Sequence, residues 1–306
     1  MPVKHYRCAK PLEPGAHVAL ISPASPLQKP EELPRAQENA RLLGWEPIVG
    51  PHATERVGYL AGHDRDRLHD INRALRDPKT DAIWCLRGGY GMMRILAGVD
   101  YDALSRTPKV IIGYSDVTAL HAAVQRKCRL VTYHGPTARE TLTDFSRDSL
   151  RRAVVEQTDS CGVAPKAREI NAGFAEGRLV GGNLAVLTSL CGTPFAPDLS
   201  DGILILEDIN EPMYRIDRML QQLKLAGALN GCRGIAFGEC VKCPDDPGGG
   251  GRAFDEVLGE IAHELGVPCL AGIPVGHIAE QWTIPLGAMA KLDTANRSLT
   301  VTSYKS

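Results

Sequence analysis

Short apolar runs alternate with amphipathic segments along the first half of the chain. The apolar runs, which predict short buried strands, cover residues 17–22, 45–49, 81–86 and 110–112. The segments between them, which predict helices, cover residues 30–43, 65–76, 92–96 and 116–127. Alternation of strand and helix is typical of a parallel sheet covered by helices, and ligands of such sheets bind beyond the carboxyl ends of the strands.

The second half of the chain repeats this alternation and then ends in strands. A glycine-containing strand at residues 179–183 leads into an apolar helix. The further predicted elements are strands at 203–206 and 234–237, helices at 213–225 and 254–265, and closing strands at 286–292 and 298–302. These patterns predict a second, smaller α/β domain that contains closing β-strands.

The pattern weakens between the two halves. A polar helix is predicted at residues 148–157, and the Thr, Asp, Ser, Gly and Pro residues that follow are typical of a connector. We therefore expect an N-terminal α/β domain of the parallel-sheet (flavodoxin- or Rossmann-like) class at residues 1–145, a linker at 146–175 and the C-terminal α/β domain at 176–306. A length of 306 residues suits two domains.

Composition narrows the choice of partners. Lys and Arg number 35 and Asp and Glu 36, so the net charge of −1 gives no electrostatic footprint for nucleic acid or an anionic membrane. No run approaches the roughly 18 apolar residues of a membrane span, and the N-terminus lacks the apolar core of a secretory signal. We expect a cytoplasmic protein whose partners are small or neutral.

The nine cysteines are scattered and odd in number, which favours reduced thiols over a disulfide framework. Cys240 and Cys243, with Cys232 nearby, resemble half of a zinc site, but no second C-x-x-C or closely spaced His pair completes four ligands. We expect no metal and no cofactor.

The stretch K-V-I-I-G-Y-S-D-V-T-A-L at residues 109–120 carries the most chemical information. It predicts a strand-to-helix turn with Ser115 at its apex, and the amide after the serine then lies at a helix N-terminus, which favours negative charge. A hydroxyl nucleophile and an oxyanion site can come from this one turn. Ser and Asp are common helix caps, so Ser115 or Asp116 can instead simply cap the first turn. The full G-x-S-x-G elbow is also absent, because Val117 replaces its second glycine.

Other loops after strands offer further chemistry. R-G-G-Y-G at residues 87–91 presents backbone amides, but it matches neither the P-loop nor the G-x-G-x-x-G motif, so nucleotide binding is weakly supported. The strand ending in E-D-I-N-E-P at 207–212 brings carboxylates to its end, although Asp208 or Asn210 can simply cap the next helix. His277 follows P-V-G, and His121 and His134 are alternative histidines.

Taken together, five motifs resemble the L,D-carboxypeptidase family of serine peptidases, in the same order and along nearly the whole chain. They are R-G-G-Y-G, G-Y-S-D-V-T-A-L, L-V-G-G-N-L, L-E-D-I-N-E-P-M-Y-R-I-D-R-M-L and G-I-P-V-G-H. The resemblance begins near residue 19 and extends to T-I-P-L-G at 283–287. Several long motifs in register make it far more specific than any one of them.

The resemblance implies a catalytic triad of Ser115 as nucleophile, Glu207 as carboxylate and His277 as base. It also implies an oxyanion hole from the backbone N–H groups of Gly89 and Asp116. From their place beside the oxyanion loop, Arg87 and Tyr90 are candidates for substrate binding, although an ion pair or ordinary packing is an equally good use of either.

The activity implied is release of the terminal D-alanine from murein tetrapeptide, at the bond to the L-centre of meso-diaminopimelate, in cytoplasmic peptidoglycan recycling by a homodimer. Two alternatives stay open. One is a microcin-immunity-like hydrolase of peptidyl or acyl adenylates, which would need an aromatic clamp although aromatics are only 5% of the chain. The other is a non-catalytic or nucleotide-binding α/β protein, although the first strand is followed by no glycine fingerprint.

Overall fold

The structure, a computed structural model, describes residues 6–244 and 251–304. Its strands are β1 (His17–Ile21), β2 (Glu46–Val49), β3 (Ala82–Cys85), β4 (Val110–Gly113), β5 (Thr132–His134), β6 (Gly162–Val163), β7 (Arg168–Asn171), β8 (Phe174–Asn183), β9 (Gly202–Ile209), β10 (Gly234–Val241), β11 (Cys269–Ala271), β12 (Ile284–Leu286), β13 (Met289–Asp293) and β14 (Ser298–Ser303). Its α-helices are α1 (Glu32–Leu42), α2 (Asp64–Arg76), α3 (Met92–Ile95), α4 (Tyr101–Arg106), α5 (Thr118–Cys128), α6 (Asp144–Arg151), α7 (Leu184–Ser189), α8 (Met213–Leu225) and α9 (Phe254–Leu265). Short 3-10 turns, η1 (Leu96–Gly98) and η2 (Ser115–Val117), and a π-helical turn, η3 (Arg152–Glu156), complete the assignment.

The described residues form two β-sheets. The first has the order β12-β5-β4-β3-β1-β2, in which all neighbours are parallel except β12, which is antiparallel to β5. The order 2-1-3-4-5 is that of flavodoxin-like folds, which place ligands where the strand order reverses, between β1 and β3. The first sheet thus belongs to the predicted α/β class.

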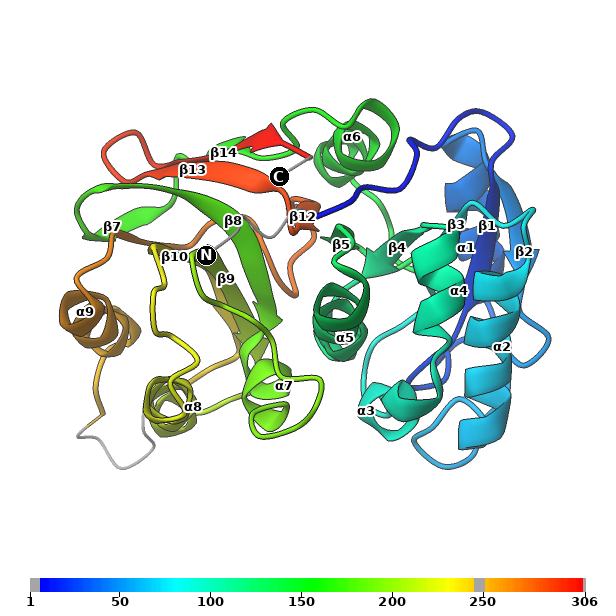
Figure 1. Cartoon of the computed structure of the whole chain (residues 1–306), viewed down its shortest axis with the longest axis horizontal. Coiled ribbons are helices and arrows are strands. Elements are labelled where there is room, and N and C mark those ends of the chain that lie inside the picture. The colour runs from blue at the N-terminus through cyan, green and yellow to red at the C-terminus, as the bar shows by residue number, and fades with distance from the viewer. Residues whose placement is uncertain (1–5, 245–250, 305–306) are drawn as a thin grey trace.

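The second sheet has the order β6-β14-β13-β8-β9-β10-β11-β7. Its centre, β8 to β11, is parallel, and the antiparallel strands lie on either side. In Figure 1 the two sheets lie side by side, with α5 between them. This mixed sheet with its closing strands agrees with the predicted second α/β unit.

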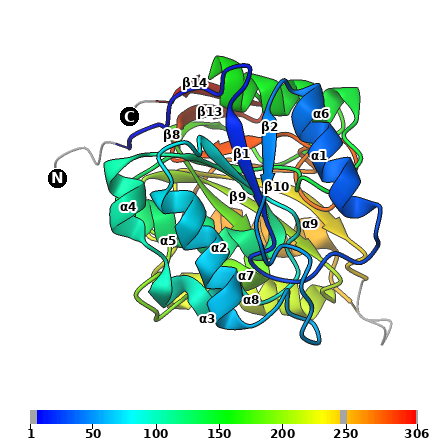
Figure 2. The same ribbon diagram turned by 90° about the vertical axis from the view of Figure 1, so that its right-hand side faces the viewer.

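Three apolar clusters hold the layers together. One buries Ile71 of α2 and Leu120 of α5 on one face of the first sheet. Another packs α7, α8 and α9 on one face of the second sheet. The third contains Ala36 of α1 and Leu150 of α6 and continues without a break into the other face of the second sheet. Figure 2 shows α1 and α2 on opposite sides of β1.

The predicted closing strand at residues 286–292 is wrong as a single element. Residues Ile284–Leu286 pair with β5 of the first sheet, whereas Met289–Asp293 pair with β8 of the second. The break falls at Gly287, which has a φ of 104° and donates its N–H to the Leu179 carbonyl. A left-handed residue interrupts an extended strand, and glycine takes this conformation without steric cost.

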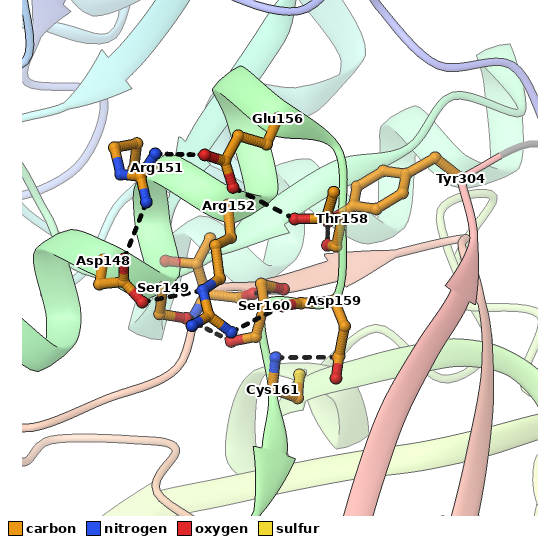
Figure 3. Close-up of polar contacts among 11 residues, drawn as sticks. Asp148, Ser149, Arg151, Arg152, Glu156, Thr158, Asp159, Ser160, Cys161 and Tyr304 are labelled. Carbon is orange, nitrogen blue, oxygen red and sulfur yellow. Dashed lines mark hydrogen bonds and ion pairs between the residues drawn. The ribbon is translucent and has the colours of Figure 1, made fainter.

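The segment at residues 146–175 contains more regular structure than the sequence predicts. The expected helix at 148–157 is α6 followed by η3, and β6 and β7 form the two edges of the second sheet. Polar contacts hold the segment in place (Figure 3): the Ser149 hydroxyl donates to the Ser160 carbonyl at 2.6 Å, and the Tyr304 hydroxyl donates to the Thr158 carbonyl at 2.8 Å. The first bond joins two parts of the segment, and the second ties the segment to Tyr304, the residue after β14.

Candidate active site

Ser115 lies directly after β4, at the first residue of η2. Its φ of 62° is in the left-handed region, which costs about 1–3 kcal/mol for a residue that is not glycine. Such strain persists only where the surroundings enforce it, and it is typical of functional turns. The loop after β3 lies against this turn, because a Cβ at Gly88 would lie only 2.9 Å from the Ser115 Cβ.

Glu207 and His277 form a buried pair at the carboxyl edge of the second sheet. His277 Nδ1 lies 2.8 Å from Glu207 Oε2, and the glutamate side chain is fully buried. Gly276 permits this approach, since a Cβ there would lie 3.0 Å from the Glu207 Cβ. An ionised carboxylate only accepts hydrogen bonds, so Nδ1 carries the proton and Nε2 keeps its lone pair. The arrangement leaves Nε2 of His277 able to accept a proton.

The environment of His277 alters its proton affinity. Burial by itself would lower the pKa of the imidazole, but the hydrogen bond and charge of Glu207, together with the charges of Glu140 and Asp208, raise it above its ordinary value of 6.5. A carboxylate hydrogen-bonded to imidazolium stabilises the protonated ring. The pair can therefore accept a proton and hold it through a reaction step.

Tyr114 joins the two halves of the candidate site. Its ring packs edge to face on His277, with centroids 4.9 Å apart, and the next residue is Ser115. Among the described residues no hydrogen bond joins Ser115 Oγ to His277 in this conformation. Such contacts are commonly long in an enzyme without substrate and tighten when substrate binds.

The loop that carries Gly89 packs against the turn that contains Ser115. Gly89 has a φ of 101°, and a Cβ there would lie 2.3 Å from Ser25 Oγ. Asp116 Oδ2 accepts the backbone N–H of Met92 at 2.8 Å, which ties the end of this loop to η2. Burial raises the pKa of the Asp116 carboxyl to about 6. The backbone of Asp116 lies in the first helical turn, where N–H groups have no helical acceptor.

The two predicted substrate-binding residues have different surroundings. Arg87 is partly buried and its guanidinium donates to the Pro26 carbonyl at 2.5 Å, while burial and the neighbouring Arg139 lower its pKa. Tyr90 is half exposed, and its ring packs edge to face on that of Tyr59 at 5.5 Å. Arg87 and Tyr90 both belong to the R-G-G-Y-G loop that contains Gly89, and their side chains make separate contacts.

Asp208, the residue after Glu207, bonds to the start of α7, whereas the sequence allowed it to cap the helix after Pro212. Asp208 accepts the N–H of Ala185, in the first turn of α7, at 2.9 Å, and Asn183 Nδ2 at 3.3 Å. It does not cap α8, which begins at Met213 and whose N-cap residue, Pro212, makes no side-chain cap hydrogen bond. Burial raises the pKa of Asp208 to about 6. The sequence could not reveal this pairing, because only the parallel register of β8 and β9 brings Asn183 beside Glu207.

Potential metal ligands lie elsewhere in the described residues. Cys232, Cys240 and Cys243 do not form a group of close ligand atoms in the described part of the chain, and Cys232 Sγ donates to the Gly234 carbonyl at 3.3 Å. Ligand atoms of His52, His69 and Asp70 come within 4.8 Å of one another, between the loop after β2 and α2. Neither group contains a residue of the Ser115, Glu207 and His277 set.

A strained serine on a strand-to-helix turn, whose neighbour Tyr114 packs on the histidine of a buried Glu–His pair, is typical of the class of serine hydrolases. The comparison with known sequences gives the family. Residues 18–135 match the LD-carboxypeptidase N-terminal domain and residues 176–292 match the C-terminal domain. The chain belongs to the LD-carboxypeptidase family, and it is a serine-type carboxypeptidase, a hydrolase.

Relatives of two kinds match nearly the whole length of this chain. It is 37% identical to the probable murein peptide carboxypeptidase of Bacillus subtilis, over 95% of this chain and 93% of that one. It is 32% identical to the murein tetrapeptide carboxypeptidase of Pseudomonas aeruginosa, over 90% and 92%. The solved structure of the microcin self-immunity protein MccF in complex with aspartyl sulfamoyl adenosine has a TM-score of 0.87 at 26% identity, over 96% and 98%.

No helix in the described part of the chain combines the length and the apolar composition needed to cross a membrane.

Proposed function

We propose that this protein is an L,D-carboxypeptidase that releases the terminal D-alanine of murein tetrapeptide. The proposal rests on the buried hydrogen bond between Glu207 and His277, on whose ring Tyr114, the residue before Ser115, packs. The relatives named for murein peptides supply the substrate class. The cleaved bond joins the L-centre of meso-diaminopimelate to D-alanine.

Acyl transfer follows from the roles of the three side chains. His277 Nε2 accepts the proton of Ser115 Oγ as the oxygen attacks the peptide carbonyl, and Glu207 stabilises the imidazolium that forms. The backbone amides of Gly89 and Asp116 donate to the tetrahedral oxyanion, each contributing roughly 3 kcal/mol. His277 then protonates the leaving amine of D-alanine. A water molecule, deprotonated by His277, hydrolyses the acyl-enzyme and restores Ser115.

The substrate ends in a carboxylate, which a carboxypeptidase must pair. We assign this role to Arg87, with Tyr90 lining the same loop, because both flank the amide of Gly89. We propose that the enzyme acts in the cytoplasmic recycling of cell-wall peptides and that it works as a homodimer.

One alternative remains within the same chemistry. The likeness to MccF, whose solved complex holds an acyl sulfamoyl adenosine, favours hydrolysis of acyl adenylates as a second candidate activity. A triad and an oxyanion hole would serve either substrate, so the distinction lies in what the cleft binds.

Mass spectrometry of the products tests the proposal. The parent protein is incubated with L-Ala-γ-D-Glu-meso-diaminopimelate-D-Ala, and in parallel with a peptidyl adenylate. We expect loss of one alanine from the tetrapeptide, and a reduction of kcat by at least about 10³-fold in Ser115→Ala. Ser189→Ala, an exposed serine on α7, is the control that keeps parental activity. Cleavage of the adenylate alone would replace the peptidase by the second candidate.

A further inference from the structure

Only one oxygen of the Glu207 carboxylate is hydrogen-bonded. Oε2 accepts from His277, whereas Oε1 is buried and has no hydrogen-bond partner among the described residues. Leaving a buried carboxylate oxygen unsatisfied is costly, because the group has lost its water without replacement. A donor near Glu207 must therefore serve Oε1, directly or through an internal water.

His134 is a candidate for that donor. It ends β5, its side chain is fully buried, and neither ring nitrogen has a hydrogen-bond partner in the described part of the chain. Its ring lies 5.9 Å from that of Tyr114, which also packs on His277. Tyr114 thus packs against both histidine rings, and the charges of Glu207 and His277 are close enough to act on His134.

The protonation of His134 suits this role. Burial lowers its pKa to about 4, so the ring is neutral near pH 7 and offers one N–H donor and one lone pair. His121, whose ring centroid is 6.5 Å away, has its Nε2 only 2.8 Å from the Gly113 carbonyl. This contact makes Nε2 the protonated nitrogen and leaves Nδ1, which is also unpartnered in the described structure, as an acceptor.

An internal water balances the donors and acceptors of these three side chains. Glu207 Oε1, His121 Nδ1 and one nitrogen of His134 are acceptors, while the two rings have a single unused N–H between them, on His134. An internal water adds two donors and can bridge groups too far apart to touch. Thr132 lies two positions before His134 on β5, and Thr283 precedes Ile284, which pairs with His134. Their buried hydroxyls, which have no partner among the described residues, make the region polar enough to hold a water molecule.

We propose that His134 is a positioning residue for the triad: its N–H, relayed by an internal water, hydrogen-bonds to Glu207 Oε1 and holds the carboxylate with Oε2 toward His277. This role rests on the proposed function of Glu207. A neutral donor solvates the carboxylate without adding a competing charge. It also spreads part of the negative charge away from the side that faces His277.

A pair of variants of similar shape separates hydrogen bonding from packing. His134→Gln keeps an N–H donor, and His134→Met, of similar length and volume, has none. We expect kcat to fall by about 10- to 100-fold in His134→Met with little change in KM, and much less in His134→Gln. Circular dichroism and thermal unfolding of both variants establish that they fold.

A second readout does not depend on turnover. The pKa of His277 is measured by proton NMR in the Ser115→Ala background, with and without each change at His134. Loss of the donor leaves more charge on the oxygen facing His277, so the His277 pKa should rise in His134→Met and stay near the parent in His134→Gln. Equal kcat and equal His277 titration in the two variants would overturn the proposal.

The two experiments also separate this inference from the proposed function. If the parent releases no alanine from the tetrapeptide, the peptidase proposal fails. The NMR titration then still decides whether His134 acts on the Glu207–His277 pair.

Discussion

The two sheets contribute to the candidate site in different ways. From the first sheet come backbone features: the left-handed Ser115 and the glycine loop at residues 87–91 that packs against it. From the second sheet come side-chain charges, a fully buried Glu207 and the His277 that it orients. The part of the site on the first sheet therefore depends on the space that glycine residues leave for close backbone approach. The part on the second sheet depends on which atoms of Glu207 and His277 carry protons.

This difference predicts which changes each half tolerates. A conservative change of charge should damage the second-sheet half while leaving its shape intact. Addition of one methyl group should damage the first-sheet half while leaving every charge intact. Substitutions at Glu207, Gly89 and Glu140 test this comparison.

Glu207→Gln should lower kcat by about 10⁴-fold. The amide has nearly the same shape, but its NH₂ group can donate to Nδ1 and favour the wrong tautomer of His277. Steady-state kinetics on the tetrapeptide measure the effect. Glu280→Gln, in the exposed segment after His277, is the matched control and should stay within about twofold of the parent. A Glu207→Gln enzyme with parental kcat would contradict the proposed role of the pair.

Gly89→Ala should lower kcat by about 100-fold, because the new Cβ meets Ser25 at 2.3 Å and the loop must move its amide. Gly15→Ala is the matched control. Its φ of 83° is equally left-handed, but a Cβ there meets nothing within 4 Å. It should lower the free energy of unfolding by about 1 kcal/mol and leave kcat unchanged. Equal kcat in both variants would show that the first half does not depend on this backbone.

The smallest expected effect concerns pH. His277 must be neutral to act as a base, and its pKa is raised by Glu207 and Glu140. As the pH falls, kcat/KM should therefore begin to drop at a higher pH than an ordinary histidine would give. Glu140→Gln removes one of the charges and should move this acid limb to lower pH. A limb that does not move on this change would mean that Glu140 does not act on the base.

The apolar pattern predicted the regular elements well and their pairing less well. The helices at Met213–Leu225 and Phe254–Leu265 have the predicted bounds, because each carries a continuous amphipathic period. The sequence did not predict the break at Gly287, because β12 and β13 are both largely apolar and differ only in the strands with which they pair. The short strands β6 and β7 were missed too, because two to four residues carry no recognisable period.

The candidate site divides in the same way. Ser115, Glu207 and His277 were named from motifs that resemble a family, and the buried Glu207–His277 contact is consistent with those roles without testing them. The loop at residues 87–91 could be recognised from the sequence, because clustered glycines indicate backbone conformations that other residues rarely adopt. The polar region around His134 was not visible, because a histidine at the end of a short strand gives no sign of which groups will face it.

Local sequence patterns indicate where most strands and helices form and which residues carry reactive groups, because period and composition act over a few neighbouring positions. Packing of the two sheets selects which of these groups come into contact. Glu207 and His277 are separated by 70 positions, and they touch because β9 and the segment after β11 end at one edge of the second sheet. Their proton affinities follow from burial and from neighbouring charges, and these exist only once the sheets have packed together.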